Sequence, residues 1–233
     1  MSSQDRGLLR QTVYDSLKAM IVTGQLPSAS RLTELELATK LKVSRTPIRE
    51  ALNKLEQDGL VVARPRQGFA VSDFDVDTMQ ETFDIREVLD GYATELATRR
   101  LTSDDKAKLK HMLADCEKLA ALANRTHADK FMELQIGTDL HRTIARLSGN
   151  SELSNMLSII LDKCLHFIWL ELTRLDDWKE ARAEHAAIVE AMCEGNASLA
   201  GQLARAHIRS SRDNILELMR AKFDLQNFMA KAS

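Results

Sequence analysis

The chain has 233 residues, of which 44% are hydrophobic and 28% charged, and its net charge is −2, all ordinary for a soluble globular protein. An aromatic content of 5%, with few β-branched residues after position 77, argues against a β-sandwich or barrel. No apolar run approaches the roughly 18 to 20 residues that span a bilayer, and the N-terminus lacks the apolar segment of a secretory signal, so no membrane partner and a cytoplasmic location are expected.

Proline usage divides the chain unevenly. All prolines lie in the first 65 positions: Pro27, Pro47 and Pro65. Because proline breaks helix interiors, the proline-free residues 66–233 permit a long helical region. We expect two domains, residues 1–75 and 76–233, joined by a linker at Ser72–Asp77.

The first predicted helix follows apolar residues at helical spacing. These residues are Leu9, Val13, Leu17, Met20 and Ile21. They predict about four turns of helix that end near Gly24. A second, shorter helix is expected after Thr33, because Glu36 follows it by three residues in a capping-box pattern.

The third predicted helix begins after Ser44, a good N-cap residue, and ends at Asp58-Gly59. Pro47 falls in its first turn, where the missing N–H has little effect. Its buried stripe is expected to consist of Ile48, Ala51, Leu52 and Leu55.

A small β-hairpin is predicted next, from apolar runs at residues 60–63 and 69–71 with a basic turn between them. Three helices followed by a hairpin is the order of a winged helix-turn-helix. The stripe of the third helix faces inward, which leaves Arg45, Thr46 and Arg49 outward near its N-terminal end. Arginine there can bind guanine with two hydrogen bonds, and a helix N-terminus can bind phosphate.

The charge distribution agrees with a nucleic-acid partner. Residues 31–66 carry eight Lys/Arg against five Asp/Glu, whereas from residue 76 onward there are 21 basic and 25 acidic residues. Arg64 and Arg66, beside the small Gly68, would place positive charge at the tip of the wing. Double-stranded DNA is therefore the expected partner.

The N-terminal motif closely resembles the DNA-binding domain of GntR-family transcriptional regulators. The resemblance is carried by Arg31-Leu32-x-Glu34-x-x-Leu37-Ala38-x-x-Leu41-x-Val43-Ser44-Arg45-Thr46-Pro47-Ile48-Arg49-Glu50-Ala51-Leu52-x-x-Leu55-x-x-Asp58-Gly59-Leu60-Val61 and by x-Pro65-x-x-Gly68-x-x-Val71. It implies contacts to bases or phosphates from Ser44, Arg45, Thr46 and Arg49, and wing contacts from Arg66, Gln67 and Gly68. Two departures stand out: Ala29 or Ser30 replaces a glycine, and Leu35 replaces an arginine that contacts DNA in some members.

The remainder of the chain breaks into about six helical segments at visible stops. They span residues 76–100, 102–124, 127–147, 153–172, 176–195 and 198–228. They predict an antiparallel all-α bundle, so the whole chain is expected to be mainly α, a winged helix-turn-helix followed by a helical bundle. The cysteines at 116, 164 and 193 show no disulfide or zinc-finger spacing and are expected to be small apolar residues in a reducing compartment.

Three histidines of the bundle stand out: His141, His185 and His207, on the third, fifth and sixth of its helices. Spacing alone cannot show that residues on three helices converge. The segments around them, Leu140-His141-Arg142-x-x-Ala145-x-x-Ser148-Gly149-Asn150, Glu184-His185-x-x-Ile188 and Ala204-x-x-His207, resemble the FCD effector domain of the FadR-type subgroup. In many such domains three histidines bind a divalent metal, together with a carboxylate four residues before the first.

This chain lacks that carboxylate, because Gly137 stands in its place. Asp139 cannot simply replace it, since it points about 200° around the helix from His141. Either three neutral imidazoles hold Zn²⁺ with an open position, or the histidines bind an anionic effector directly. We favour the three-histidine zinc site.

Two further residues are candidates for the effector pocket on the basis of the resemblance. Arg86 occupies an inward-facing arginine position of the family, and Asn150 matches an asparagine after the third bundle helix. Simpler interpretations are an intrahelical pair of Arg86 with Asp90 and a helix C-cap for Asn150.

Taken together, these features favour a dimeric transcriptional regulator, a metabolite-responsive repressor rather than an enzyme. The winged domain would bind a pseudo-palindromic operator as a homodimer, and the bundle would bind a small acidic metabolite. Two alternatives stay open. One is a metal-dependent helical hydrolase, although H-E-x-x-H is absent; the other is a regulator whose bundle only dimerises.

Overall fold

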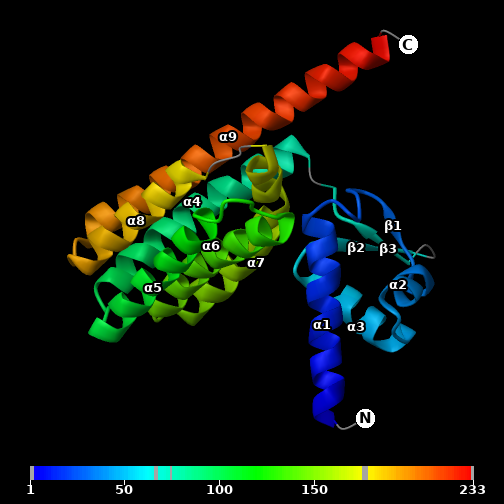
Figure 1. The fold of residues 1–233 in the computed structure, drawn as a ribbon, viewed down its shortest axis with the longest axis horizontal. Helices are drawn as coiled ribbons and strands as arrows, with labels where there is room; N and C mark the ends of the chain where they lie inside the picture. Colours follow the sequence, from blue (N-terminus) through cyan, green and yellow to red (C-terminus); the bar gives the residue numbers. More distant parts are fainter. Residues whose placement is uncertain (1–2, 66–67, 74, 175–177, 232–233) are drawn as a thin grey trace. The chain divides into compact units, whose positions relative to one another are not determined.

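The computed structural model describes residues 3–65, 68–73, 75–174 and 178–231, and it divides into two compact units, residues 1–75 and 76–233 (Figure 1). Each unit has its own hydrophobic core. Among the described residues, no helix is both long and apolar enough to cross a bilayer.

Helices and a small sheet make up the N-terminal unit. Its described elements are α1 (Ser3–Val22), β1 (Arg31–Leu32), α2 (Glu34–Leu41), α3 (Arg45–Gln57), β2 (Val61–Arg64) and β3 (Gly68–Val71). Helix α1 packs against α3. The predicted stripe of α3 is buried, with Ile48, Leu52 and Leu55 fully enclosed beside Leu17 of α1. The predicted winged helix-turn-helix is confirmed.

The sheet has one strand more than the sequence predicted. Its order is β1-β3-β2, with all pairs antiparallel. Strand β1 pairs Arg31 with Ala70, far along the chain. A two-residue strand is too short to show an alternating pattern, so nothing in the local sequence could have indicated it.

Thr33 and Lys42 stand at the two ends of α2, and Ser44 precedes α3. The Thr33 hydroxyl accepts a hydrogen bond from the Glu36 amide (3.3 Å), which caps α2. Lys42 adopts a left-handed conformation (φ 55°) that ends α2 and makes the tight turn. Ser44 occupies the N-cap position of α3 with an extended backbone, but its side chain makes no capping hydrogen bond with the described backbone.

Six helices form the described part of the C-terminal unit, as predicted. They are α4 (Val76–Thr98), α5 (Ser103–Ala120), α6 (His127–Leu147), α7 (Ser151–Arg174), α8 (Lys179–Cys193) and α9 (Ala197–Lys231). Helix α4 packs against α6, α7 and α9, and α8 lies along α9 (Figure 1). The predicted start of the fifth helix at residues 176–177 lies outside the described residues.

The bundle core positions the elements that carry the histidines. One apolar cluster joins α4, α5, α6, α8 and α9 through Ala97, Leu109, Leu140, Ile188 and Ala204, one from each helix. Thr102 begins α5 with a capping box to Asp105. A second capping box, between Thr126 and Asp129, begins α6. These caps and the shared core set the rotation of each helix, and therefore the direction of its histidine.

Candidate metal centre and nucleic-acid interface

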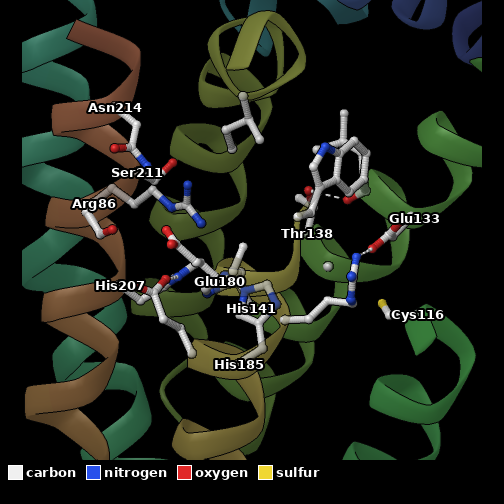
Figure 2. Close-up of a pocket in the computed structure, with 18 residues that line it drawn as sticks. Arg86, Cys116, Glu133, Thr138, His141, Glu180, His185, His207, Ser211 and Asn214 are labelled. Carbon is white, nitrogen blue, oxygen red and sulfur yellow. Dashed lines mark hydrogen bonds and ion pairs between the residues drawn. The ribbon is translucent and has the colours of Figure 1, made fainter. Parts of the chain in front are cut away.

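Three histidine side chains from different helices meet inside the bundle. The Nε2 atom of His185 (α8) lies 3.2 Å from that of His141 (α6) and 3.1 Å from that of His207 (α9). Figure 2 shows the three rings pointing toward one another. His141 and His207 are buried, and His185 is half-buried. The structure thus brings together the three predicted ligands.

The spacing of these nitrogen atoms fits a tetrahedral metal. Zinc binds imidazole nitrogen at about 2.0–2.1 Å, which separates two nitrogen ligands of a tetrahedral site by about 3.3 Å. Each ring also turns Nε2, not Nδ1, toward the common centre. The donor set therefore suits Zn²⁺ or a similar divalent ion.

Carboxylates support two of the three rings from behind. His141 Nδ1 donates to Asp90 Oδ1 (3.0 Å), and His207 Nδ1 donates to Glu184 Oε2 (2.7 Å). Asp90 also accepts a hydrogen bond from Arg86 Nε through its other oxygen (3.0 Å). Such contacts place the proton on Nδ1 and leave the Nε2 lone pair for a metal. Sequence reasoning identified Asp90 only as a partner of Arg86 and gave Glu184 no role.

Burial and neighbouring charges favour neutral His185 and His207 and a charged Asp90. Burial and the neighbouring imidazoles hold the pKa values of His185 and His207 well below the usual range. Burial alone would raise the pKa of Asp90, but His141 and Arg86 outweigh it and lower that pKa to about 2. Neutral imidazoles are the form that binds metal.

A cavity of about 110 Å³ opens beside the histidines. This volume accommodates a small organic molecule. Its lining includes Arg86, Gly137, Thr138, Trp178, Arg182, the three histidines and three glutamates. Cys116 also lines it, but burial raises the pKa of its thiol to about 12, so it stays protonated.

The two predicted effector residues have different positions. Arg86 is buried at the cavity wall, where it also makes the intrahelical pair with Asp90. Asn150 is not among the described residues that line the cavity. Its Oδ1 accepts a hydrogen bond from the Leu153 amide (3.0 Å) at the start of α7, and Ser148 is the C-cap of α6. Asn150 thus acts as an N-terminal cap, and neither interpretation from the sequence described it.

On the N-terminal unit, the predicted contact residues of α3 share one exposed surface. Ser44, Arg45, Thr46 and Arg49 are all exposed near the start of the helix. Arg49 makes two hydrogen bonds to Glu34 of α2, from Nε (2.6 Å) and Nη2 (2.8 Å). Arg45 Nε lies 3.5 Å from the same carboxylate. Sequence reasoning placed Glu34 in the family motif without assigning it this role.

The predicted wing residues lie partly within the described structure. Gly68 begins β3 in a left-handed conformation (φ 84°), and an added Cβ would lie 3.3 Å from the Leu32 carbonyl oxygen. Glycine is therefore favoured there by the backbone itself. Arg66 and Gln67 lie outside the described residues, and their contacts with DNA stay predictions.

Each of the two units matches the model of a known protein family. Residues 9–71 match the model for bacterial regulatory proteins of the gntR family, and residues 81–210 match the FCD domain. The uncharacterized HTH-type transcriptional regulator YdhC of Bacillus subtilis (strain 168) is 30% identical over 207 residues, which cover 88% of this chain and 90% of that protein. The Nta operon transcriptional regulator of Aminobacter aminovorans is 28% identical over 204 residues, covering 86% and 91%.

A solved structure described as E. coli McbR/YncC has the same fold, with a TM-score of 0.72 and 23% identity over 95% of this chain and 100% of that one. The matching families are those of regulators, which sets aside the hydrolase alternative. The chain therefore belongs to the gntR family of bacterial regulatory proteins, carries an FCD domain, and is a DNA-binding transcriptional regulator rather than an enzyme.

Proposed function

We propose that this regulator is a homodimeric repressor that binds a pseudo-palindromic operator and releases it when a small carboxylate binds beside a metal ion in the bundle. The observation that carries the proposal is the convergence of three Nε2 atoms, two of whose rings are supported by carboxylates. Converging imidazoles whose Nδ1 atoms are held by carboxylates are typical of protein metal sites.

In this proposal His141, His185 and His207 hold the ion, and zinc is the expected metal. When bound, the ion supplies a positive charge that attracts and orients an anion. Asp90 and Glu184 hold the rings in place and retain the proton on Nδ1. Direct binding of an anion by the histidines is not expected, because neutral His185 and His207 carry no charge to attract one.

A carboxylate is the proposed effector class because of the charges around the cavity. Arg86 is a buried basic residue of the cavity lining, but Asp90 compensates its charge. Arg182 is likewise paired, through Nη1 with Glu133 (3.0 Å). The metal therefore supplies the uncompensated positive charge that favours an acidic metabolite.

The homodimer is supported by an apolar stripe on α4. Ile85, Val88 and Tyr92 are 52%, 62% and 48% exposed, and their spacing places them on one face of the helix. We propose that a second copy covers this face, because a two-fold pair of winged units matches a pseudo-palindromic operator.

Val88→Asp should produce monomers in sedimentation analysis, whereas Met132→Asp on α6, 52% exposed, should not. A dimeric Val88→Asp variant would remove this face from the proposal.

The effector and the operator are coupled by thermodynamic linkage. A carboxylate that weakens operator binding must itself bind the DNA-bound protein more weakly by the same factor. A bundle that only dimerises would show no such coupling. Titration of small carboxylates against the operator complex separates these two functions.

Metal analysis of the purified protein tests the central part of the proposal. Wild type should retain about one zinc per chain, and His185→Ala should lose it. The matched control is His111→Ala, because His111 is a histidine of α5 whose side chain is 73% exposed. Equal metal content in wild type and His185→Ala would overturn the three-histidine site.

A further inference from the structure

Leu35 is an exposed apolar residue in the first turn of α2. It is 65% exposed and lies outside the apolar core of the described part of the N-terminal unit. Leu37 is 3% exposed and belongs to that core, and Leu35 lies about 200° around the helix from it. A single exposed leucine is ordinary on a protein surface. The neighbours of Leu35 are what give it a role.

Carboxylates flank Leu35 on both sides, and both are engaged within the protein. Glu34 accepts two hydrogen bonds from Arg49, and one of its oxygens lies 3.5 Å from Arg45 Nε. Glu36 Oε2 accepts a hydrogen bond from the hydroxyl of Thr33, the N-cap residue (2.6 Å). Between these two occupied carboxylates, Leu35 presents a branched apolar group to the solvent.

Leu35 also adjoins the arginines of α3 that are proposed to bind DNA. Its α-carbon is about 3.8 Å from that of Glu34, and Glu34 joins the start of α2 to Arg45 and Arg49. Thr39, one turn further along α2, is exposed, and its hydroxyl donates a hydrogen bond to the Leu35 carbonyl oxygen (2.9 Å). The DNA-binding surface of α3 therefore continues onto α2 through Leu35.

The chemistry of a leucine side chain selects the kind of DNA group that it can contact. Phosphate oxygens are bound by charged groups, hydroxyls and backbone amides, none of which this side chain supplies. In the major groove, thymine is the one unmodified base that presents an apolar group, its 5-methyl. Burying a group of this size changes an affinity by about fourfold. The apolar side chain beside the arginines thus suits a thymine.

We propose that Leu35 is a specificity-determining residue that contacts the methyl group of one thymine in each half-site of the operator. The inference rests on the proposed DNA-binding surface of α3 and adds a contact from α2. Arg45 and Arg49 favour guanine through hydrogen bonds, whereas Leu35 favours thymine through apolar contact. Each half-site is therefore read by two helices and by two kinds of interaction.

Deoxyuridine provides a direct test, because it differs from thymidine only by the missing methyl group. In an operator that wild type selects from random duplexes, each thymine of the half-site is replaced in turn, in both half-sites together. Fluorescence anisotropy measures the affinity. We expect one position at which deoxyuridine weakens wild-type binding by about fourfold per half-site. Unchanged affinity at every position would overturn the thymine contact.

Leu35→Ala assigns that contact to its residue. The variant should bind the unmodified operator more weakly than wild type, and deoxyuridine at the sensitive position should change its affinity no further. The matched control is Leu122→Ala, an exposed leucine just after α5 (45% exposed), which should respond to deoxyuridine like wild type. If Leu35→Ala still lost about fourfold per half-site, another residue would read the thymine and the proposal would be overturned.

Leu35→Gln is a second variant that keeps the side chain long but makes it polar. Operators that it selects from random duplexes should lose the preference for thymine at the sensitive position, because glutamine favours adenine. The remaining positions of the half-site should be selected as by wild type. An unchanged preference for thymine in these operators would overturn the role of Leu35.

The failures of the two proposals are distinguishable. Full specific binding by Arg45→Ala combined with Arg49→Ala would contradict the surface of α3 itself. Loss of binding by that double variant, together with an identical response of wild type and Leu35→Ala to deoxyuridine, would contradict only the role of Leu35. Melting temperatures close to that of wild type show that the variants are folded.

Discussion

Each unit of this regulator has a carboxylate that holds two basic side chains, but the surroundings differ. In the N-terminal unit, Glu34 contacts Arg45 and Arg49, whose side chains are 64% and 61% exposed. In the bundle, Asp90 contacts Arg86 and His141, and the Arg86 and Asp90 side chains are only 3% and 1% exposed. A carboxylate therefore contacts basic side chains in water at one site and inside the protein at the other.

This difference in exposure determines how firmly each unit holds its basic side chains. An exposed ion pair contributes about 0–1 kcal/mol, so the arginines can leave Glu34 for DNA with little loss. Removing one partner of a buried pair costs about 3–5 kcal/mol, so Asp90 keeps its neighbours fixed. The arginines of the DNA-binding surface can thus exchange Glu34 for DNA, whereas the side chains around Asp90 are preorganised.

Asp90→Asn tests the buried side of the comparison and should have the largest effect. It leaves Arg86 buried without its counter-charge, so we expect the free energy of unfolding to fall by about 3–5 kcal/mol. Metal affinity should fall about 10- to 100-fold, because His141 loses its supporting carboxylate. Asp84→Asn is the control, since Asp84 pairs with Arg212 but is 53% exposed. If urea unfolding showed similarly small losses of stability for Asp90→Asn and Asp84→Asn, the buried pair would not be the stronger of the two.

Arg45→Ala combined with Arg49→Ala tests the exposed side. Each arginine that reads a base is worth about 1–3 kcal/mol of discrimination, so specific binding to an operator selected from random duplexes should be abolished. The melting temperature should stay near that of wild type. Lys118→Ala, an exposed charge on α5, should bind the operator normally. Undiminished specific binding by the double variant would refute the interface.

Acidification should destabilise the metal-free bundle. Burial and the neighbouring imidazoles lower the folded-state pKa of His185 and His207, so the unfolded chain binds protons first as the pH falls. The contribution of these two histidines to the free energy of unfolding is fully present above pH about 6.5. Below that pH it is lost, by up to about 1.4 kcal/mol per pH unit for each histidine. Unfolding in chelator at pH 7.5 and 5.5 measures this loss.

The matching variant is His185→Gln combined with His207→Gln, which should lose much less stability over the same interval. If the pH dependence of the two proteins were identical, the buried histidines would not be its source.

Glu34→Gln should have the smallest effect on folding, below about 1 kcal/mol. It adds one net positive charge to the DNA-binding surface. The slope of the logarithm of the binding constant for non-specific DNA against the logarithm of salt concentration should therefore become steeper by about 0.9. Discrimination between operator and non-specific DNA should decrease, because Arg49 loses its two-bond orientation. An unchanged salt slope together with unchanged discrimination would show that Glu34 does not position the arginines.

Periodicity and caps predicted most of the fold. The buried stripe of α3 and the Thr102 cap of α5 depend on residues close in sequence, so they could be read locally. Strand β1 could not, because its two residues are defined only by pairing with β3. Boundaries were also predicted where glycine or proline marks a turn.

The sites were less predictable, because they depend on contacts between residues far apart in the sequence. Each histidine could be assigned to a helix, but the rotation of three helices that brings the Nε2 atoms together depends on the whole core. The contact of Glu34 with Arg49 crosses from α2 to α3, and Glu184 was visible only as a neighbour of His185. The capping of α7 by Asn150 was not predicted, because the sequence related Asn150 to the end of α6 or to the pocket. Its contact with an effector stays a prediction.

X-ray absorption at the zinc edge of the purified, zinc-loaded protein measures the ligands of the three-histidine site themselves. We expect three imidazole nitrogens at about 2.0–2.1 Å and the remaining position filled by oxygen. His185→Ala should not give this signal. A sulfur ligand at about 2.3 Å, or fewer than three imidazoles, would contradict a metal site built from His141, His185 and His207.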